Sequence, residues 1–194
     1  MKRLLYLVFI VLVIGLTVFI LGKKDQDITQ KTRKLEDCGK QIVSLTEGPY
    51  YKAGSPQRQK LSDSGTVGTH LILKGYVVDI NCKPIENAWI DFWQADGKGD
   101  YDNEGYNLRG HQYTNKEGFF RIESVVPGEY PGRTPHIHFK VRRSENSPII
   151  TSQLFFPDST QNSTDSIFDE SLIVEYGTDP DGSKYASFTI VVPN

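Results

Sequence analysis

The sequence contains little sulfur and no excess of charge of either sign. Only two of its 194 residues are cysteine, which is too few for a disulfide-dense scaffold or a zinc site built on cysteine, although one bridge can form. Lysine and arginine total 22 against 24 aspartate and glutamate residues, which gives a formal net charge of −2. Because a surface that binds phosphates must be basic, this balance argues against a protein built around nucleic acid.

Aromatic and turn-forming residues, in contrast, are plentiful. Aromatic side chains make up 11% of the chain, a content that excludes disorder of the whole chain. The 17 glycines and 10 prolines are many for a helical bundle and normal for short strands joined by turns. The length suits one ordinary domain with a tail.

The N-terminus carries an almost unbroken apolar run from Leu4 to Leu21 between basic residues. About 18–20 apolar residues are enough to span the core of a bilayer. Residues 1–22 are therefore interpreted as a membrane anchor or a cleaved signal segment, and the lack of a small-residue cleavage site after the run favours the anchor. Both interpretations export the domain, either anchored and facing outside the cytoplasm or, after cleavage, secreted or periplasmic.

The remainder divides into a charged, polar tether over residues 23–44 and a predicted β domain over residues 45–194. Short segments rich in Val, Ile, Phe, Tyr and Thr alternate there with Gly, Pro, Asn and Asp clusters. The expected strands are His70–Asp79, Ala88–Gln94, Gly118–Glu123, His136–Arg142, Ile150–Phe156, Leu172–Tyr176 and Tyr185–Val192. With no helical pattern between them, they predict an all-β fold, an antiparallel β-sandwich. The connection over residues 95–116 is long enough to indicate a functional loop.

The most specific local feature is the run His136-Ile137-His138 in one expected strand. Side chains alternate across a strand, so residues two apart project from the same face. Two imidazoles held in this way are suited to a shared metal ion. The same pattern is also typical of two histidines on a polar strand face, so the pair alone leaves both interpretations open.

Two tyrosines in turn-rich contexts add a family resemblance to this run. Tyr101 ends the segment Gly97–Tyr101, and Tyr130 lies in the segment Pro127–Pro131, shortly before Arg133–His138. Together these segments resemble the intradiol ring-cleavage dioxygenases, the family of protocatechuate 3,4-dioxygenase and catechol 1,2-dioxygenase. The resemblance extends from Thr46 to about residue 156.

The resemblance implies one Fe(III) per chain, with Tyr101 and His136 as equatorial ligands and Tyr130 and His138 as the axial pair. A phenol has a pKa near 10, but a trivalent cation displaces its proton and gains a hard anionic oxygen ligand. The implied substrates are a small aromatic diol and O₂. Their reaction is cleavage between the two hydroxylated carbons to a cis,cis-muconate-type diacid.

Further roles follow from the same resemblance. Arg133 aligns with a family arginine beside the site, where a guanidinium would stabilise negative charge on the ring; its structural alternative is a rim salt bridge. Gln153 aligns with a glutamine near the metal, although a strand glutamine is often only a hydrogen-bonded edge residue. Tyr50 and Tyr51 would wall the substrate pocket or pack the rim of the sandwich.

A different class of protein shares much of this strand and turn pattern. Transthyretin-like and carboxypeptidase-regulatory sandwiches act as binding or spacer domains at cell surfaces, and they need neither the histidine pair nor the second tyrosine. A zinc hydrolase built on the same histidines lacks an obvious third ligand and general base. Export would also allow a Cys38–Cys82 bridge between the N-terminal arm and the sandwich, with two unrelated thiols as the alternative.

Overall fold

The structure is a computed structural model that describes residues 38–194. The expected anchor or signal segment and most of the expected tether lie outside the described residues. Residues 39–194 form one compact unit. Over residues 38–194, no helix has the length and apolar character that a membrane span requires.

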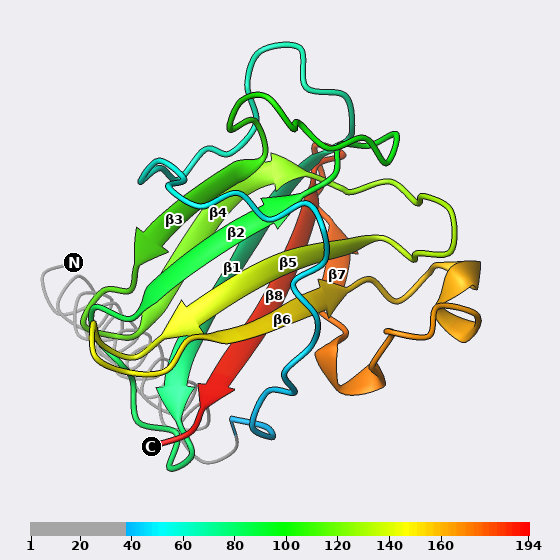
Figure 1. Cartoon of the computed structure of the whole chain (residues 1–194). Coiled ribbons are helices and arrows are strands. Elements are labelled where there is room, and N and C mark those ends of the chain that lie inside the picture. Colours follow the sequence, from blue (N-terminus) through cyan, green and yellow to red (C-terminus); the bar gives the residue numbers. More distant parts are fainter. Residues whose placement is uncertain (1–37) are drawn as a thin grey trace, which may run out of the picture. The chain divides into compact units, whose positions relative to one another are not determined.

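Two four-stranded sheets face each other, as Figure 1 shows. The first sheet has the order β4 (Phe119–Val125), β1 (His70–Asp79), β8 (Lys184–Val192), β7 (Glu175–Thr178). The second has the order β3 (Arg109–Tyr113), β2 (Trp89–Gln94), β5 (His136–Arg142), β6 (Ile150–Phe155). Two short 3₁₀ helices, η1 (Thr160–Ser163) and η2 (Glu170–Leu172), follow the second sheet. The predicted all-β sandwich is confirmed.

The pairing differs from the prediction in one place. All strand pairs are antiparallel except β1 and β8, which run parallel from Leu71↔Lys184 to Asp79↔Val192. Parallel neighbours need a crossover instead of a hairpin, and the chain that builds the second sheet provides this crossover. The first sheet is therefore mixed.

The predicted positions of secondary structure along the chain are wrong in two places. β3 lies inside the segment that the sequence predicted to be a loop, because its residues Arg109–Tyr113 lack alternating apolar side chains. The expected strand at residues 172–176 starts later, at Glu175. Leu172 instead ends η2 and is buried in the core, which explains its apolar character without a strand.

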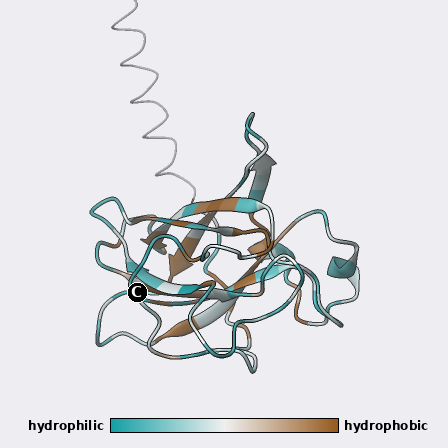
Figure 2. Ribbon diagram, turned by 90° about the horizontal axis from the view of Figure 1, so that it is seen from above, coloured by the Kyte–Doolittle hydropathy of each residue, from teal (hydrophilic) through white to brown (hydrophobic). Residues whose placement is uncertain are grey.

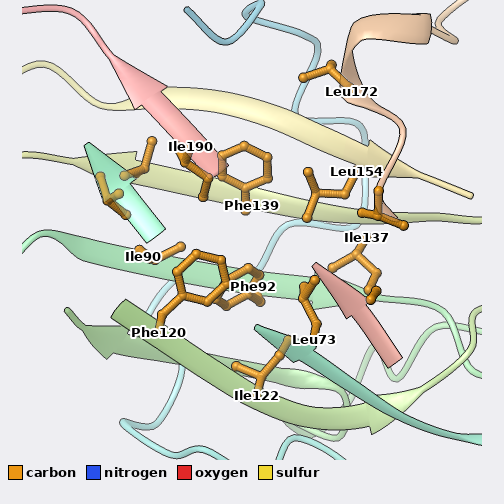
Figure 3. Close-up of a cluster of buried hydrophobic side chains, with 14 of the residues drawn as sticks. Leu73, Ile90, Phe92, Phe120, Ile122, Ile137, Phe139, Leu154, Leu172 and Ile190 are labelled. Carbon is orange, nitrogen blue, oxygen red and sulfur yellow. The ribbon is translucent and has the colours of Figure 1, made fainter. Parts of the chain in front are cut away.

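The core lies between the two sheets and comes from one face of each strand. In the second sheet, Ile90, Phe92, Ile137 and Phe139 point inward and are 0% exposed. Figure 3 shows them against residues of the first sheet, including Ile190. Burying one such side chain stabilises the fold by about 1.5–3 kcal/mol. Hydrophobic residues accordingly lie mainly on the strands, whereas the loops are mostly hydrophilic (Figure 2).

The part of the outer face of the second sheet that carries Asp91, Trp93, His136 and His138 is also buried, because the N-terminal segment covers it. This segment crosses in front of β2 and β5, drawn blue to cyan in Figure 1. It is attached to the sheet by hydrogen bonds from Gln153 Nε2 to the carbonyl of Thr46 at 3.1 Å and from Arg109 Nη1 to the carbonyl of Tyr50 at 2.6 Å. The segment begins close to Cys38, and both Cys38 and Cys82 are disulfide-bonded.

Candidate metal centre

Two histidines and two tyrosines meet on this covered outer face. His136 and His138 project from β5 with their Nε2 atoms 3.0 Å apart. The Tyr130 hydroxyl, from the turn before β5, lies 3.3 Å from His136 Nε2. The ring of Tyr101, from the loop after β2, is edge-on to Tyr130 with centroids 5.9 Å apart. The structure therefore brings together all four residues that the resemblance predicted as ligands.

The tyrosine-bearing loops pack closely against each other because glycines line their contact. The amide of Gly128 donates to the carbonyl of Asp96 at 2.7 Å. A Cβ on Gly99, which has φ +90°, would lie 2.3 Å from the carbonyl oxygen of Glu129. A side chain there would meet backbone, so the glycines are required to hold Tyr101 and Tyr130 near each other.

The two histidines are oriented in different ways. His136 Nδ1 lies 2.6 Å from the carbonyl oxygen of Thr134 and donates its proton there, which leaves the lone pair on Nε2. His138 Nδ1 is buried without a hydrogen-bond partner among residues 38–194. Its ring instead stacks on Trp93, with centroids 4.7 Å and planes 8° apart.

Electrostatics keep both imidazoles neutral and thus able to bind a cation. Burial and the nearby positive charge of Arg133 lower the pKa of His136 to about 4. Burial and the neighbouring His136 lower the pKa of His138 well below its ordinary value. Burial raises the pKa of the Tyr101 and Tyr130 phenols. Without a cation, the cluster is therefore uncharged at neutral pH.

The geometry and the unpaired atoms of the cluster fit a bound metal ion. The hydroxyl of Tyr101 is buried with no hydrogen-bond partner among the described residues, a situation that ordinarily costs about 1–3 kcal/mol. Two nitrogen ligands at about 2.1 Å from one ion and at a right angle to each other are about 3.0 Å apart, the separation found between His136 and His138. Within residues 38–194, no group of three or more His, Cys, Asp or Glu side chains could hold a metal. The cluster is not such a group, because two of its four expected ligands are tyrosines.

Arg133 and Gln153 lie beside the cluster and contact each other. Arg133 Nη1 donates to the Tyr130 hydroxyl at 3.3 Å, and Nη2 donates to Gln153 Oε1 at 2.5 Å. Gln153 is paired with His138 in the β5–β6 register, and Trp93 is paired with His138 in the β2–β5 register. Trp93, His138 and Gln153 therefore form one row across β2, β5 and β6 beside the cluster.

Tyr50 and Tyr51 are consecutive but have different neighbours. Tyr50 stacks on Tyr101, with centroids 4.3 Å apart and planes at 14°, and so forms a wall of the cluster. Tyr51 packs against Trp93 at 4.8 Å. Its hydroxyl donates to Asp91 Oδ2 at 3.2 Å. Of the two residues predicted to line the pocket, Tyr50 thus touches the cluster, whereas Tyr51 contacts Trp93 and Asp91.

Three residues of the site had not been predicted. Trp93 supports His138 as described, and a tryptophan in an expected strand offered no signal beyond its side of the sheet. Arg109 is 2% exposed, and its guanidinium lies 5.9 Å from the ring centroid of Tyr101. Asp165 forms an ion pair with Arg133 at 2.9 Å. It lies 32 residues further along the chain, in a segment with no recognisable motif.

The fold and the cluster define a β-sandwich with a tyrosine–histidine cluster that fits a metal ion, and comparisons with known proteins identify its family. A family model described as dioxygenase matches residues 46–191. The chain belongs to the intradiol ring-cleavage dioxygenase family, as its motifs predicted. This result supports an enzyme rather than a spacer domain.

Individual relatives agree with this assignment. The chain is 30% identical to catechol 1,2-dioxygenase of Acinetobacter baylyi over 132 residues, which cover 58% of this chain and 42% of that protein. The solved dioxygenase domain of a dioxygenase and carbohydrate-binding protein fusion from Streptomyces sp. SirexAA-E is 40% identical, with a TM-score of 0.76, over 79% of this chain and 99% of the other. An intradiol ring-cleavage dioxygenase from Tetranychus urticae is 26% identical, with a TM-score of 0.72, over 80% and 95%.

The chain spans about a third to about two thirds of the length of its curated relatives.

Proposed function

We propose that this chain cleaves a catechol-type aromatic between its two hydroxylated carbons, using O₂ and one non-haem Fe(III), to give a cis,cis-muconate-type diacid. Tyr101, Tyr130, His136 and His138 would hold the iron. The observation that carries this proposal is the meeting of two neutral imidazoles and two buried phenols in a chain of this family. When bound, the ferric ion would bind the diol and make its ring reactive toward O₂.

The two tyrosines are suited to different tasks. Tyr101 lies under Tyr50, and its hydroxyl has no other partner among the described residues, so we assign it to permanent binding. Tyr130 lies in a turn closed by the hydrogen bond from Arg133 N to its carbonyl at 2.9 Å, and its hydroxyl lies 3.3 Å from both His136 Nε2 and Arg133 Nη1. We assign its phenolate oxygen to accept a proton from a substrate hydroxyl as the diol binds.

Arg133 and Gln153 would act on the bound ring. The Arg133 guanidinium is a fixed positive charge beside Tyr130, so it would stabilise negative charge that develops on the ring when O₂ attacks. Gln153 Oε1 accepts from Arg133, and its amide nitrogen donates to Thr46. Held at both ends, the Gln153 amide would orient the substrate through the arginine.

We further propose that the domain works outside the cytoplasm. The disulfide-bonded state of Cys38 and Cys82 supports this, because disulfides persist in oxidising compartments. Attachment to a membrane through residues 1–22 rests on the sequence alone. Because residues 1–22 contain none of the expected iron ligands, a chain that begins near Asp25 should be soluble and should bind iron as the full chain does. Iron binding by the full-length protein alone would contradict this.

The test of the proposed function is direct. Purified protein loaded with Fe(III) should absorb visible light through tyrosinate-to-iron charge transfer, adding a catechol should shift this band, and mass spectrometry should detect the diacid. The matched control is the double variant Tyr101→Phe/Tyr130→Phe, which keeps both rings but should lack the band. Protein that excludes Fe(III) and stays colourless would refute the proposal.

A further inference from the structure

Asp165 is a buried carboxylate that comes from a distant part of the chain and contacts the turn between Tyr130 and β5. Its side chain is 1% exposed. Oδ2 accepts from Arg133 Nε at 2.9 Å and from the amide of Thr134 at 3.0 Å. Oδ1 accepts from the amide of Ile167 at 2.9 Å. One oxygen thus holds the turn that precedes β5, while the other holds the loop of Asp165 itself.

The guanidinium of Arg133 has a different partner on each of its nitrogens. Nε donates to Asp165, Nη1 to the Tyr130 hydroxyl and Nη2 to Gln153. Because a guanidinium is planar and rigid, a partner that fixes Nε also fixes the directions of the two Nη groups. Asp165 therefore sets which way Arg133 faces the cluster.

Neighbouring contacts fix the carboxylate relative to the turn. The Thr134 hydroxyl donates to Asn162 in η1. Ser159 and Gln161 donate to the carboxylate of Glu129 at 2.7 and 2.6 Å. These bonds connect residues 159–165 to residues 129–134 on both sides of Tyr130. Among residues 38–194, Asp165 is the only residue that forms an ion pair with Arg133.

We propose that Asp165 is a positioning residue, which holds the Arg133 guanidinium against Tyr130 and Gln153 so that its charge faces the substrate ring. This inference rests on the proposed function for the ring, whereas the orientation of Arg133 can be measured without metal or substrate. The side chain of Arg133 is 14% exposed. Without its anion, the guanidinium would be a poorly hydrated unpaired charge and would turn toward water.

The experiment compares Asp165→Asn, which keeps the shape of the side chain but removes its charge, with Arg133→Ala and the double variant. Asp63→Asn is the matched control, because Asp63 pairs with Arg58 on the surface and is 57% exposed. Iron-loaded Asp165→Asn should keep its iron and its visible band and lose about 10–100-fold in kcat, with KM little changed. In the Arg133→Ala background, the same substitution should cost no further activity. Asp165→Glu should recover part of kcat.

A second measurement needs neither iron nor activity. In metal-free protein labelled with ¹⁵N-arginine, the Arg133 Nε–H should exchange slowly with water in the wild type and in Asp63→Asn, and rapidly in Asp165→Asn. Unchanged exchange, unchanged kcat or an equal further loss in the Arg133→Ala background would each overturn the positioning role. If Asp165→Asn does not fold, Asp165→Ser, which also removes the negative charge, is tested by the same exchange and kcat criteria. Slow Arg133 exchange that depends on Asp165 in a protein without ring cleavage would refute the proposed function alone.

Discussion

The two faces of β5 are equally buried and chemically opposite. Ile137 and Phe139 on the inner face are 0% exposed, and His136 and His138 on the outer face are 2% exposed. The inner residues pack against the apolar face of another sheet, whereas the outer ones meet tyrosines and an arginine brought by loops. The extent of burial therefore does not distinguish a hydrophobic core from a functional site. The chemical character of the residues that cover each face does. Substitutions on one strand should consequently separate stability from metal binding.

The largest expected effect is the loss of the metal on the outer face. His136→Ala or His138→Ala should abolish iron binding and turnover, because the cluster described in residues 38–194 would keep only three of its four expected ligands. Phe139→Ala on the inner face should instead lower the free energy of unfolding by about 3–5 kcal/mol. Iron content and urea unfolding measure the two effects. Full activity in His136→Ala would contradict the assignment.

The next effect isolates charge from metal binding. Arg133→Ala should keep the iron and the visible band but lower kcat by about 10²–10³, as the removal of an oxyanion donor does. Steady-state kinetics with a catechol, together with iron analysis, test this. Arg121→Ala is a suitable control, since Arg121 forms an ion pair with Glu123 on β4, in the sheet that does not carry the cluster. An equal loss in the control would make the charge effect unspecific.

The tyrosines should differ from each other. Tyr101→Phe removes an oxygen that has no other partner among the described residues, so iron affinity should fall at least about tenfold. Tyr130→Phe removes the oxygen assigned to take the substrate proton, and it should lower kcat more than iron affinity. Metal titration of both variants, followed through the charge-transfer band, measures the contrast. Identical behaviour would show that the two phenols share one role.

Much of this arrangement was predictable from local sequence. The alternation of a strand places His136 and His138 on one face, and the family resemblance of the segments around Tyr101 and Tyr130 indicated the same site. β3 was missed because its side chains do not alternate between apolar and polar: only Arg109 and Gly110 are buried, and the segment around residues 56–58 that bonds to the strand lies far away in the chain. The contact between Asp165 and Arg133 was unpredictable for the same reason. It joins two loops whose meeting depends on the whole sandwich.

In the metal-free chain, the pH dependence of the free energy of unfolding should distinguish the outer face of β5 from its inner face. Burial lowers the pKa of His136 to about 4, so protons bind more readily to the unfolded chain between about pH 6.5 and pH 4. The contribution of His136 to the free energy of unfolding is therefore fully present above about pH 6.5. Between about pH 6.5 and pH 4 this free energy should fall by about 1.4 kcal/mol per pH unit because of this histidine. Urea unfolding at several pH values tests this. His136→Ala should show a smaller slope, and Phe139→Ala the wild-type slope at a lower stability.

The smallest expected effect concerns the support of His138. Its Nδ1 has no hydrogen-bond partner among residues 38–194, and its ring is held by stacking on Trp93. His136, in contrast, is oriented by the carbonyl of Thr134. Trp93→Phe keeps an aromatic face of smaller area, so iron affinity should weaken by less than about tenfold while kcat stays close to the wild type. Trp89→Phe on the same strand is the matched control and should leave iron affinity unchanged. If both variants bind iron as the wild type does, packing within the cluster alone orients His138, and the stacked indole contributes nothing to the site.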